Sequence, residues 1–123
     1  VTPNFIGDIV TDLAALLQGG LGMASSANIG TNKALFEPVH GSAPDIAGKG
    51  FANPTGMILS IGMMFAWLGN KTKEKKYIVA HRLVEDAVAE HYRTSGMRTM
   101  DLGGNCGTKE LTDSIISIIK KQA

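Results

Sequence analysis

Two acidic residues near the start of the chain have the spacing of a metal site. Asp8 and Asp12 lie four residues apart, and a helix predicted over residues 8–18 would place both carboxylates on one face, one turn apart. The sequence offers no nearby counter-charge, because its first basic residue is Lys33. A hard divalent cation such as Mg²⁺ or Mn²⁺ would supply one, since these ions prefer carboxylate oxygens. An alternative stays open: Asp8 could cap the helix, and negative charge in a first helical turn is favourable without a metal.

The second candidate for chemistry is a long loop over residues 40–53 (HGSAPDIAGKGFAN), which follows a strand predicted over residues 34–39. The loop carries a carboxylate at Asp45 and an amide at Asn53 that could hydrogen-bond a purine edge. Backbone N–H groups are available at Gly41, Ser42 and Ala43. Such a loop could bind a nucleotide, although it lacks the G-x-G-x-x-G fingerprint. An Ω-like surface loop held by its own turns is the alternative.

The apolar pattern predicts the elements that must position these segments. Residues 1–6 are predicted as a strand, and the helix over residues 8–18 ends at Gly19 and Gly20. Residues 21–33 are predicted as an irregular polar loop.

Three further helices are predicted in the second half of the chain. Asn53 and Pro54 signal a helix start, and the helix to about residue 68 is apolar almost all round, which predicts a central core position. The next helix, over residues 73–92, is amphipathic, and its apolar stripe consists of Ala80, Val84, Ala87, Val88 and His91. The last helix has Thr108 as its expected cap, and its expected buried residues are Leu111, Ile115, Ile118 and Ile119.

Composition argues against nucleic acid and membrane partners. The chain is 44% hydrophobic and 19% charged, with a net charge of +1, as in an ordinary globular protein. Its basic cluster is interrupted by Glu74 and has no interleaved aromatic residues, which favours a solvated loop. The cluster consists of Lys71, Lys73, Lys75 and Lys76. The longest apolar run, over residues 57–68, is too short to cross a bilayer.

The cysteine content and the start of the chain suggest an intracellular origin and a larger parent protein. Cys106 is the single cysteine, which agrees with a reducing compartment. The chain opens at Val1 with no initiator methionine and no signal peptide. We therefore expect a fragment of a longer chain, located in the cytoplasm, or in the mitochondrial matrix if the source is eukaryotic.

Three stretches closely resemble the β-decarboxylating dehydrogenases that act on isocitrate, homoisocitrate and 3-isopropylmalate. They are NFIGDIVTDLAALLQGGLGMASSANIG (residues 4–30), ALFEPVHGSAPDIAGKGFANPTGMILS (residues 34–60) and DLGGNCGT (residues 101–108). The resemblance covers almost the whole chain and is weakest over residues 69–98. It implies an α/β fold that is helix-rich with a few strands. The fold would be the C-terminal segment of the isopropylmalate-dehydrogenase-like fold, which differs from the Rossmann fold.

The resemblance also implies how this single segment, residues 1–123, is organised. Residues 1–30 would form a metal-binding strand, helix and loop. Residues 34–53 would form an NAD-binding strand and loop, and residues 54–123 the helical part of the cofactor domain.

Individual site residues follow from the same resemblance. Asp8 and Asp12 match the aspartates that bind Mg²⁺ or Mn²⁺ together with the substrate's hydroxyl and adjacent carboxylate. Glu37 matches a cofactor-binding position toward the nicotinamide end. The positions matched around the adenosine are His40, Gly41, Ser42, Ala43, Asp45 and Asn53, with Ile46 beside Asp45. NAD is expected, because Asp45 can accept hydrogen bonds from ribose hydroxyls but would repel the 2′-phosphate of NADP.

The reaction implied is oxidation of a 2-hydroxy acid with a β-carboxylate, followed by loss of CO₂ with the metal as electron sink. The lysine and tyrosine that transfer protons would lie upstream, so this segment alone should be inactive. Its DLAALLQGGLG stretch looks more like the isocitrate and homoisocitrate branches than the 3-isopropylmalate branch. Isocitrate is the expected substrate, with 3-isopropylmalate and homoisocitrate as alternatives. A homodimer or higher oligomer is implied, with a third metal-binding aspartate from another subunit.

Two other classes of function remain open for this chain: a non-catalytic regulatory subunit, and a free-standing nucleotide-binding or scaffold module.

Overall fold

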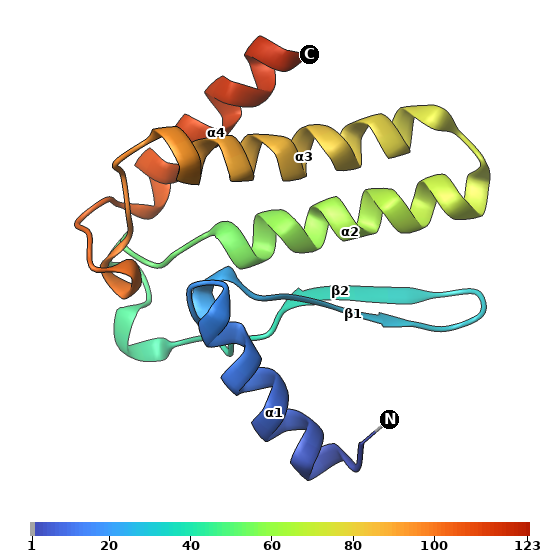
Figure 1. Ribbon diagram of the computed structural model, residues 1–123, viewed down its shortest axis with the longest axis horizontal. Helices are drawn as coiled ribbons and strands as arrows, with labels where there is room; N and C mark the ends of the chain where they lie inside the picture. The colour runs from blue at the N-terminus through green and yellow to red at the C-terminus, as the bar shows by residue number, and fades with distance from the viewer. Residues whose placement is uncertain (1) are drawn as a thin grey trace.

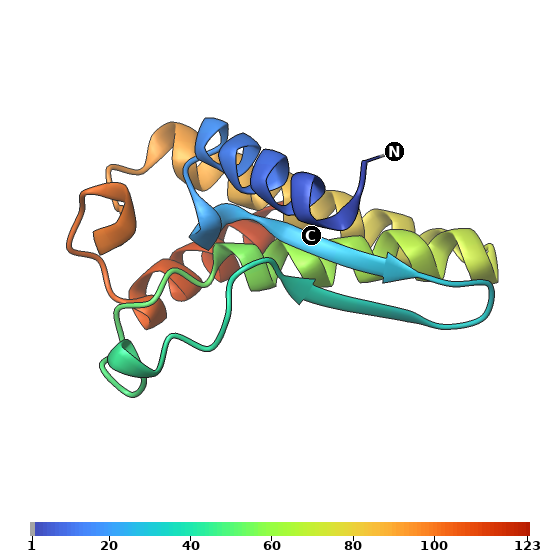
Figure 2. The ribbon, with the colours of Figure 1, turned by 90° about the horizontal axis from the view of Figure 1, so that it is seen from below.

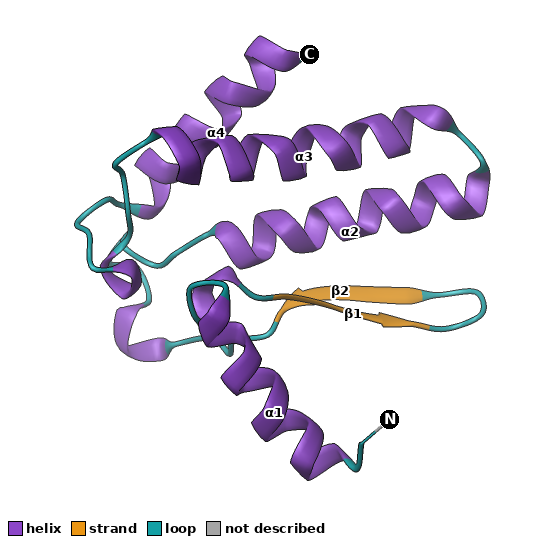
Figure 3. Ribbon diagram, viewed as in Figure 1, coloured by secondary structure: helices purple, strands orange, loops and turns teal. Residues whose placement is uncertain are grey.

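The computed structural model describes residues 2–123, and helices dominate it (Figure 3). Among these residues there are four α-helices and one two-stranded antiparallel sheet. In chain order the elements are α1 (Asn4–Leu17), β1 (Ser25–Ile29), β2 (Ala34–Pro38), α2 (Thr55–Thr72), α3 (Lys75–Thr94) and α4 (Thr108–Gln122). The helix-rich character predicted from the sequence is confirmed.

The α2–α3 pair is the centre of the molecule. The two helices run antiparallel, the β1–β2 hairpin lies along α2, and α4 crosses α3 (Figure 1). The loop after β2 extends past the start of α2 toward the start of α4 (Figure 2). This arrangement brings the segment over residues 40–53 next to the turn that precedes α4.

Glycines in α2 allow its close approach to α3. A Cβ on Gly69 would lie 2.5 Å from Cδ1 and 2.8 Å from Cγ1 of Ile78. The buried residues of α2 are accordingly small: Thr55, Gly56, Ser60, Gly62 and Gly69. The prediction that this helix buries apolar side chains almost all round is therefore wrong in detail. Backbone proximity buries α2, while the side chains of Met57 and Ile61 remain exposed.

Gly69→Ala should destabilise the α2–α3 pair. The added methyl group overpacks against Ile78 and the Ile78 backbone nitrogen, 3.2 Å away, which should cost about 1–3 kcal/mol despite the better helix propensity of alanine. Denaturant unfolding of the complete protein measures the loss. Gly96→Ala is the control, because a Cβ there meets no atom within 4 Å. Equal stability of the two variants would contradict this packing account.

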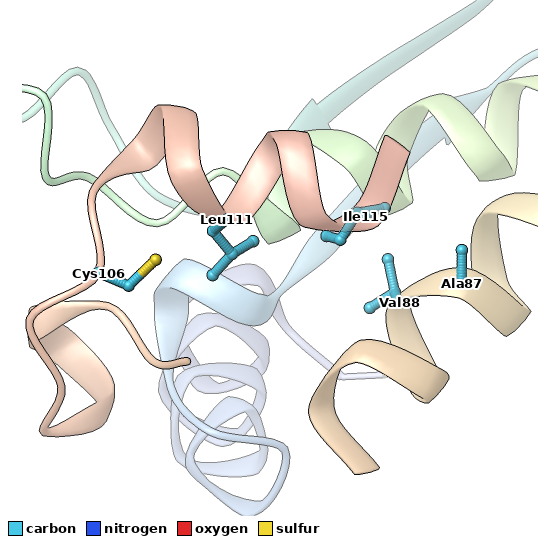
Figure 4. Packing of buried hydrophobic residues seen from close by; sticks show 5 residues of the cluster. All are labelled: Ala87, Val88, Cys106, Leu111 and Ile115. Carbon is cyan, nitrogen blue, oxygen red and sulfur yellow. The ribbon is translucent and has the colours of Figure 1, made fainter. Parts of the chain in front are cut away.

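The hydrophobic core joins α3 to α4. It consists of Ala87, Val88, Cys106, Leu111 and Ile115 (Figure 4), with Ile118 and Ile119 packed at its edge. The buried faces predicted for α3 and α4 are confirmed, because the core residues on these two helices belong to the predicted apolar stripes. His91, also on the predicted stripe of α3, is fully buried as well. Both helices are amphipathic, so their apolar stripes identified the buried side.

The start of α4 differs from the prediction. Gly107 occupies the cap position, and its N–H donates to the Oε2 of Glu110 at 2.9 Å. The hydroxyl of Thr108 donates instead to the carbonyl oxygen of Ala52, and the N–H of Thr108 donates to that of Gly50 at 2.8 Å. The side chain predicted as a cap therefore ties α4 to the loop over residues 40–53.

Two predictions for the first third of the chain are wrong. The strand expected over residues 1–6 is absent from its described part: α1 already begins at Asn4, and Val1 lies outside the described residues. The irregular loop expected over residues 21–33 contains β1, which pairs with β2 from Ser25 opposite Pro38 to Ile29 opposite Ala34. β1 was missed because its sequence, SSANI, lacks apolar alternation and its strand form depends on backbone pairing with β2.

α1 is weakly packed against the rest of the described chain. Ala15 is its only buried residue, whereas Phe5 and Leu17 are 77% and 91% exposed. Its other exposed apolar residues are Ile6, Ile9, Val10, Leu13 and Leu16. An apolar surface of this kind typically marks a protein contact.

None of the described helices has both the length and the apolar character needed to cross a membrane.

His91 should make the stability of the α3–α4 core depend on pH. Its ring is fully buried, and its Nδ1 hydrogen-bonds the Ser114 hydroxyl at 2.9 Å. Burial lowers the pKa of His91, and the nearby charge of Arg98 lowers it further. A lowered pKa means that the unfolded chain binds more protons, so stability is lost as pH falls below the unfolded value of about 6.5.

The expected slope is at most about 1.4 kcal/mol per pH unit for one proton. Denaturant unfolding of the complete protein between pH 5 and pH 7.5 measures it. His91→Gln should flatten the curve in this range, because glutamine does not titrate. An unchanged slope in that variant would show that another group causes the pH dependence.

Candidate functional site

The loop after β2 borders a cavity of about 580 Å³. Six of the predicted cofactor residues line it: His40, Gly41, Ser42, Ala43, Ile46 and Asn53. The remaining wall is formed by Gly22, Phe51, Ala52, Met100 and Asp101. The structure therefore brings together most of the loop residues that the sequence singled out.

Local turns and distant contacts hold this loop in place. Ala43 adopts the left-handed conformation, with φ of 45°, and precedes a 3₁₀ turn over Pro44–Ile46. The N–H of Val39 donates to the carbonyl of Ala24 at 3.1 Å, at the start of the loop. Thr108 on α4 fixes the other end through Gly50 and Ala52, as described above. The chain around this loop is thus anchored to Ala24, just before β1, and to α4.

Asn53 has a fixed orientation at one end of the cavity. Its Oδ1 accepts the N–H of Thr55 at 3.0 Å, and its Nδ2 donates to the Oδ2 of Asp101 at 3.0 Å. A Cβ on Gly22 would lie 2.5 Å from the same Oδ2 atom and 3.1 Å from the Cβ of Asn53. Glycine at position 22 is therefore needed for this amide and carboxylate to sit together.

Asp101 and Met100 are wall residues that the sequence did not identify as site residues. They belong to a short turn over Met100–Leu102, far along the chain from the loop. The only signal was that DLGGNCGT, which begins at Asp101, was among the stretches with a family resemblance. Phe51 and Ala52 lie within the predicted loop but carry no polar side chain that would have marked them.

Two predicted cofactor residues lie outside the wall of this cavity. Asp45 is exposed on the 3₁₀ turn next to the wall residue Ile46. Glu37, on β2, lines a neighbouring cavity of about 920 Å³ together with Asp8, and its Oε1 accepts from Asn28 at 3.4 Å. His40 and Gly41 line both cavities, so the two spaces share a wall.

The two predicted metal ligands lie on α1. Both carboxylates are exposed, one helical turn apart, and that of Asp8 accepts a hydrogen bond from Asn4 at 3.3 Å. Asp8 is not a cap, because α1 begins four residues earlier. Asp8 lines the 920 Å³ cavity, whereas Asp12 lines neither cavity.

The donor chemistry of this pair fits Mg²⁺ or Mn²⁺, but two carboxylates do not complete a coordination shell. Within residues 2–123 no three His, Cys, Asp or Glu side chains form a cluster that could hold a metal ion. Further ligands would have to come from substrate, water or another chain.

Charge in the 580 Å³ cavity disfavours an additional anion. Its wall includes the carboxylate of Asp101 and no lysine or arginine. A phosphate placed here would find backbone N–H groups but no cationic side chain in the described wall. The cavity therefore suits the planar polar edge of a ligand better than a phosphate group.

Comparison with known proteins gives a consistent result. A sequence model of the family described as isocitrate/isopropylmalate dehydrogenase matches residues 1–115. The 3-isopropylmalate dehydrogenase of Saccharolobus solfataricus is 49% identical over 115 residues, which are 94% of this chain and 34% of that protein. The homoisocitrate dehydrogenase of Methanocaldococcus jannaschii is 52% identical over 122 residues, which are 99% of this chain and 33% of that protein.

Solved structures agree with these relatives. The structure of isocitrate dehydrogenase from Methylococcus capsulatus matches with a TM-score of 0.85 and 46% identity, over 95% of this chain and 33% of that chain. A β-decarboxylating dehydrogenase from Thermococcus kodakarensis matches with a TM-score of 0.83 and 43% identity, over 96% and 32% of the two chains. The chain described here spans about one third of the length of these relatives.

Proposed function

Because the chain belongs to the isocitrate/isopropylmalate dehydrogenase family, we propose that the complete protein oxidatively decarboxylates a 2-hydroxy acid with a β-carboxylate, using NAD. In this proposal, residues 1–123 supply the adenosine end of the cofactor site and two metal ligands. One observation carries the proposal: the cavity at the cofactor loop shares His40 and Gly41 with the cavity lined by Asp8 and Glu37. A dinucleotide that passes His40 and Gly41 would extend from Asn53 in one cavity toward Asp8 in the other.

The adenine is placed at Asn53 and Asp101. The N–H groups of the amide are engaged with Asp101 and Met23, so the amide and carboxylate offer oxygen acceptors for the exocyclic amine of the purine, and Phe51 and Ile46 supply apolar wall. Asp45 is placed at the ribose, at the edge of the cavity. The absence of lysine and arginine from the described wall supports NAD over NADP.

Asp8 and Asp12 would hold Mg²⁺ or Mn²⁺ at the other end, beside Glu37. Bound NAD would supply the hydride acceptor, and the metal held by these carboxylates would supply the positive charge that stabilises the decarboxylation. Among the residues that line the 920 Å³ cavity, none is a lysine or tyrosine. Proton transfer is therefore assigned to residues outside this segment, and a third carboxylate ligand to another subunit of a homodimer.

The substrate proposed is isocitrate. Relatives of nearly equal identity are named homoisocitrate, isocitrate/homoisocitrate and 3-isopropylmalate dehydrogenase, so these three acids are the substrates to compare. Initial rates of NADH formation by the complete protein, with Mn²⁺ and each acid, test the proposal. Mn²⁺-dependent NADH formation that is fastest with isocitrate supports it. Turnover only with homoisocitrate or 3-isopropylmalate would correct the substrate, and no turnover with any of them would favour a regulatory subunit.

A further inference from the structure

Tyr92, on α3, lies behind the cofactor cavity rather than in its wall. Its hydroxyl is 2.7 Å from the Oγ1 of Thr55, the first residue of α2. Thr55 is fully buried, and its backbone N–H donates to the Oδ1 of Asn53 at 3.0 Å. A short chain of hydrogen bonds therefore links the tyrosine hydroxyl to the amide at the purine end of the cavity.

A second set of contacts joins Tyr92, through Arg98, to the segment that precedes Asp101. The guanidinium of Arg98 lies 4.9 Å from the centre of the Tyr92 ring and donates to the Tyr92 carbonyl at 2.6 Å. It also donates to the carbonyls of Ser95 and Met97, at 2.7 and 2.8 Å. These bonds fix the segment that leads into the Met100–Leu102 turn, where Asp101 accepts from Asn53.

The ring of Tyr92 is not locked by packing alone. Tyr92 and Arg98 border a separate cavity of about 560 Å³, whose wall also includes Gly19, Met23 and Leu59. Burial raises the pKa of Tyr92, so its hydroxyl stays protonated and available for the bond to Thr55 at neutral pH. The hydrogen bond therefore helps to hold the Tyr92 ring against the start of α2.

We propose that Tyr92 is a positioning residue for purine recognition: through the bond of its hydroxyl to Thr55 it holds Asn53, and with it the Asn53–Asp101 pair, in the arrangement that reads the adenine edge. This inference rests on the proposed assignment of the cavity to the adenosine of NAD. Removal of the hydroxyl should let the amide and carboxylate move relative to each other. Preorganisation, and with it selectivity for adenine, should fall while the distant metal site is unaffected.

The test compares two dinucleotides in the complete enzyme: NAD and its hypoxanthine analogue, which lacks the exocyclic amine of adenine. Tyr92→Phe should lower the preference ratio for NAD over the analogue by about three- to tenfold, both in dissociation constants from quenching of protein fluorescence and in kcat/KM, as expected for loss of one hydrogen bond. The kcat at saturating NAD and the KM of the hydroxy acid should stay within about twofold. Tyr77→Phe is the matched control, because no hydrogen bond of its hydroxyl is found among the described residues, and should leave the ratio unchanged.

Thr55 provides an independent variant from the other side of the bond. Thr55→Val should reproduce the loss of selectivity, Thr55→Ser should retain most of the wild-type ratio, and Tyr92→Phe with Thr55→Val should lose little more than either change alone. Equal losses with both dinucleotides in Tyr92→Phe, or additive losses in the double variant, would overturn the positioning role. A wild-type enzyme that is indifferent to the purine, or uses neither dinucleotide, would overturn the cofactor assignment itself.

Discussion

Asp12→Asn in the complete enzyme is expected to lower Mn²⁺-dependent turnover on the order of a hundredfold or more, as expected for loss of a direct ligand. The substitution keeps the size of the side chain but removes one of the two negative charges on α1 that would hold the cation. NAD affinity should stay within about twofold, since Asp12 lies outside the wall of the cofactor cavity. Initial rates over a Mn²⁺ titration give the first quantity, and quenching of protein fluorescence by NAD gives the second.

A second exposed aspartate controls for this change. Asp86→Asn on α3 removes the same charge from a solvent-exposed position outside both cavities, and should leave turnover and NAD affinity as in wild type. Asp12→Asn should not unfold α1, because it relieves repulsion from Asp8 one turn away. Parallel losses of metal-dependent turnover and NAD affinity in Asp12→Asn would indicate a structural role for this residue.

Asp45→Lys together with Ile46→Tyr is expected to raise the preference for NADP over NAD by about a hundredfold. Each unit charge about 4 Å from a phosphate contributes about 1 kcal/mol in water and about 4 kcal/mol near a protein surface. The double substitution removes a repulsion and adds an attraction next to a cavity whose described wall lacks cationic side chains. The tyrosine supplies a hydroxyl beside the phosphate. The ratio of kcat/KM for the two cofactors is the measurement.

The control for charge alone is Asp86→Lys, which makes the same reversal on α3 rather than on the loop and should leave cofactor preference unchanged. If the Asp45 and Ile46 double variant keeps the NAD preference of the wild type, the 3₁₀ turn over Pro44–Ile46 does not face the ribose. The assignment of the loop to adenosine would then be wrong at this position.

Sequence patterns predicted the elements whose burial is one-sided. α3 and α4 were identified with their buried faces, because each has an apolar stripe at helical spacing. The prediction for α2 failed in its packing, since Gly62 and Gly69 bury the backbone and leave larger apolar side chains outside. β1 and the first turn of α1 were missed, because neither has the local periodicity that marks its secondary structure.

The candidate site was predictable where it is contiguous in sequence. His40, Gly41, Ser42 and Ala43 were found together because one loop carries them. Asp101 was missed, since only the tertiary contact between the Met100–Leu102 turn and the loop brings it to Asn53. The connection through Tyr92 likewise depends on the antiparallel pairing that places the end of α3 beside the start of α2 (Figure 1), a tertiary contact that no local pattern predicts.

Residues 1–123 are proposed to supply both the metal carboxylates and the adenosine site. A crystal structure of the complete protein with Mn²⁺ and NAD, with anomalous scattering recorded at the manganese edge, tests it most directly. We expect a manganese peak within ligand distance of the Asp8 and Asp12 carboxylates and the adenine beside Asn53 and Asp101. A manganese peak away from α1, or adenine bound outside the cavity lined by His40 and Asn53, would contradict the account.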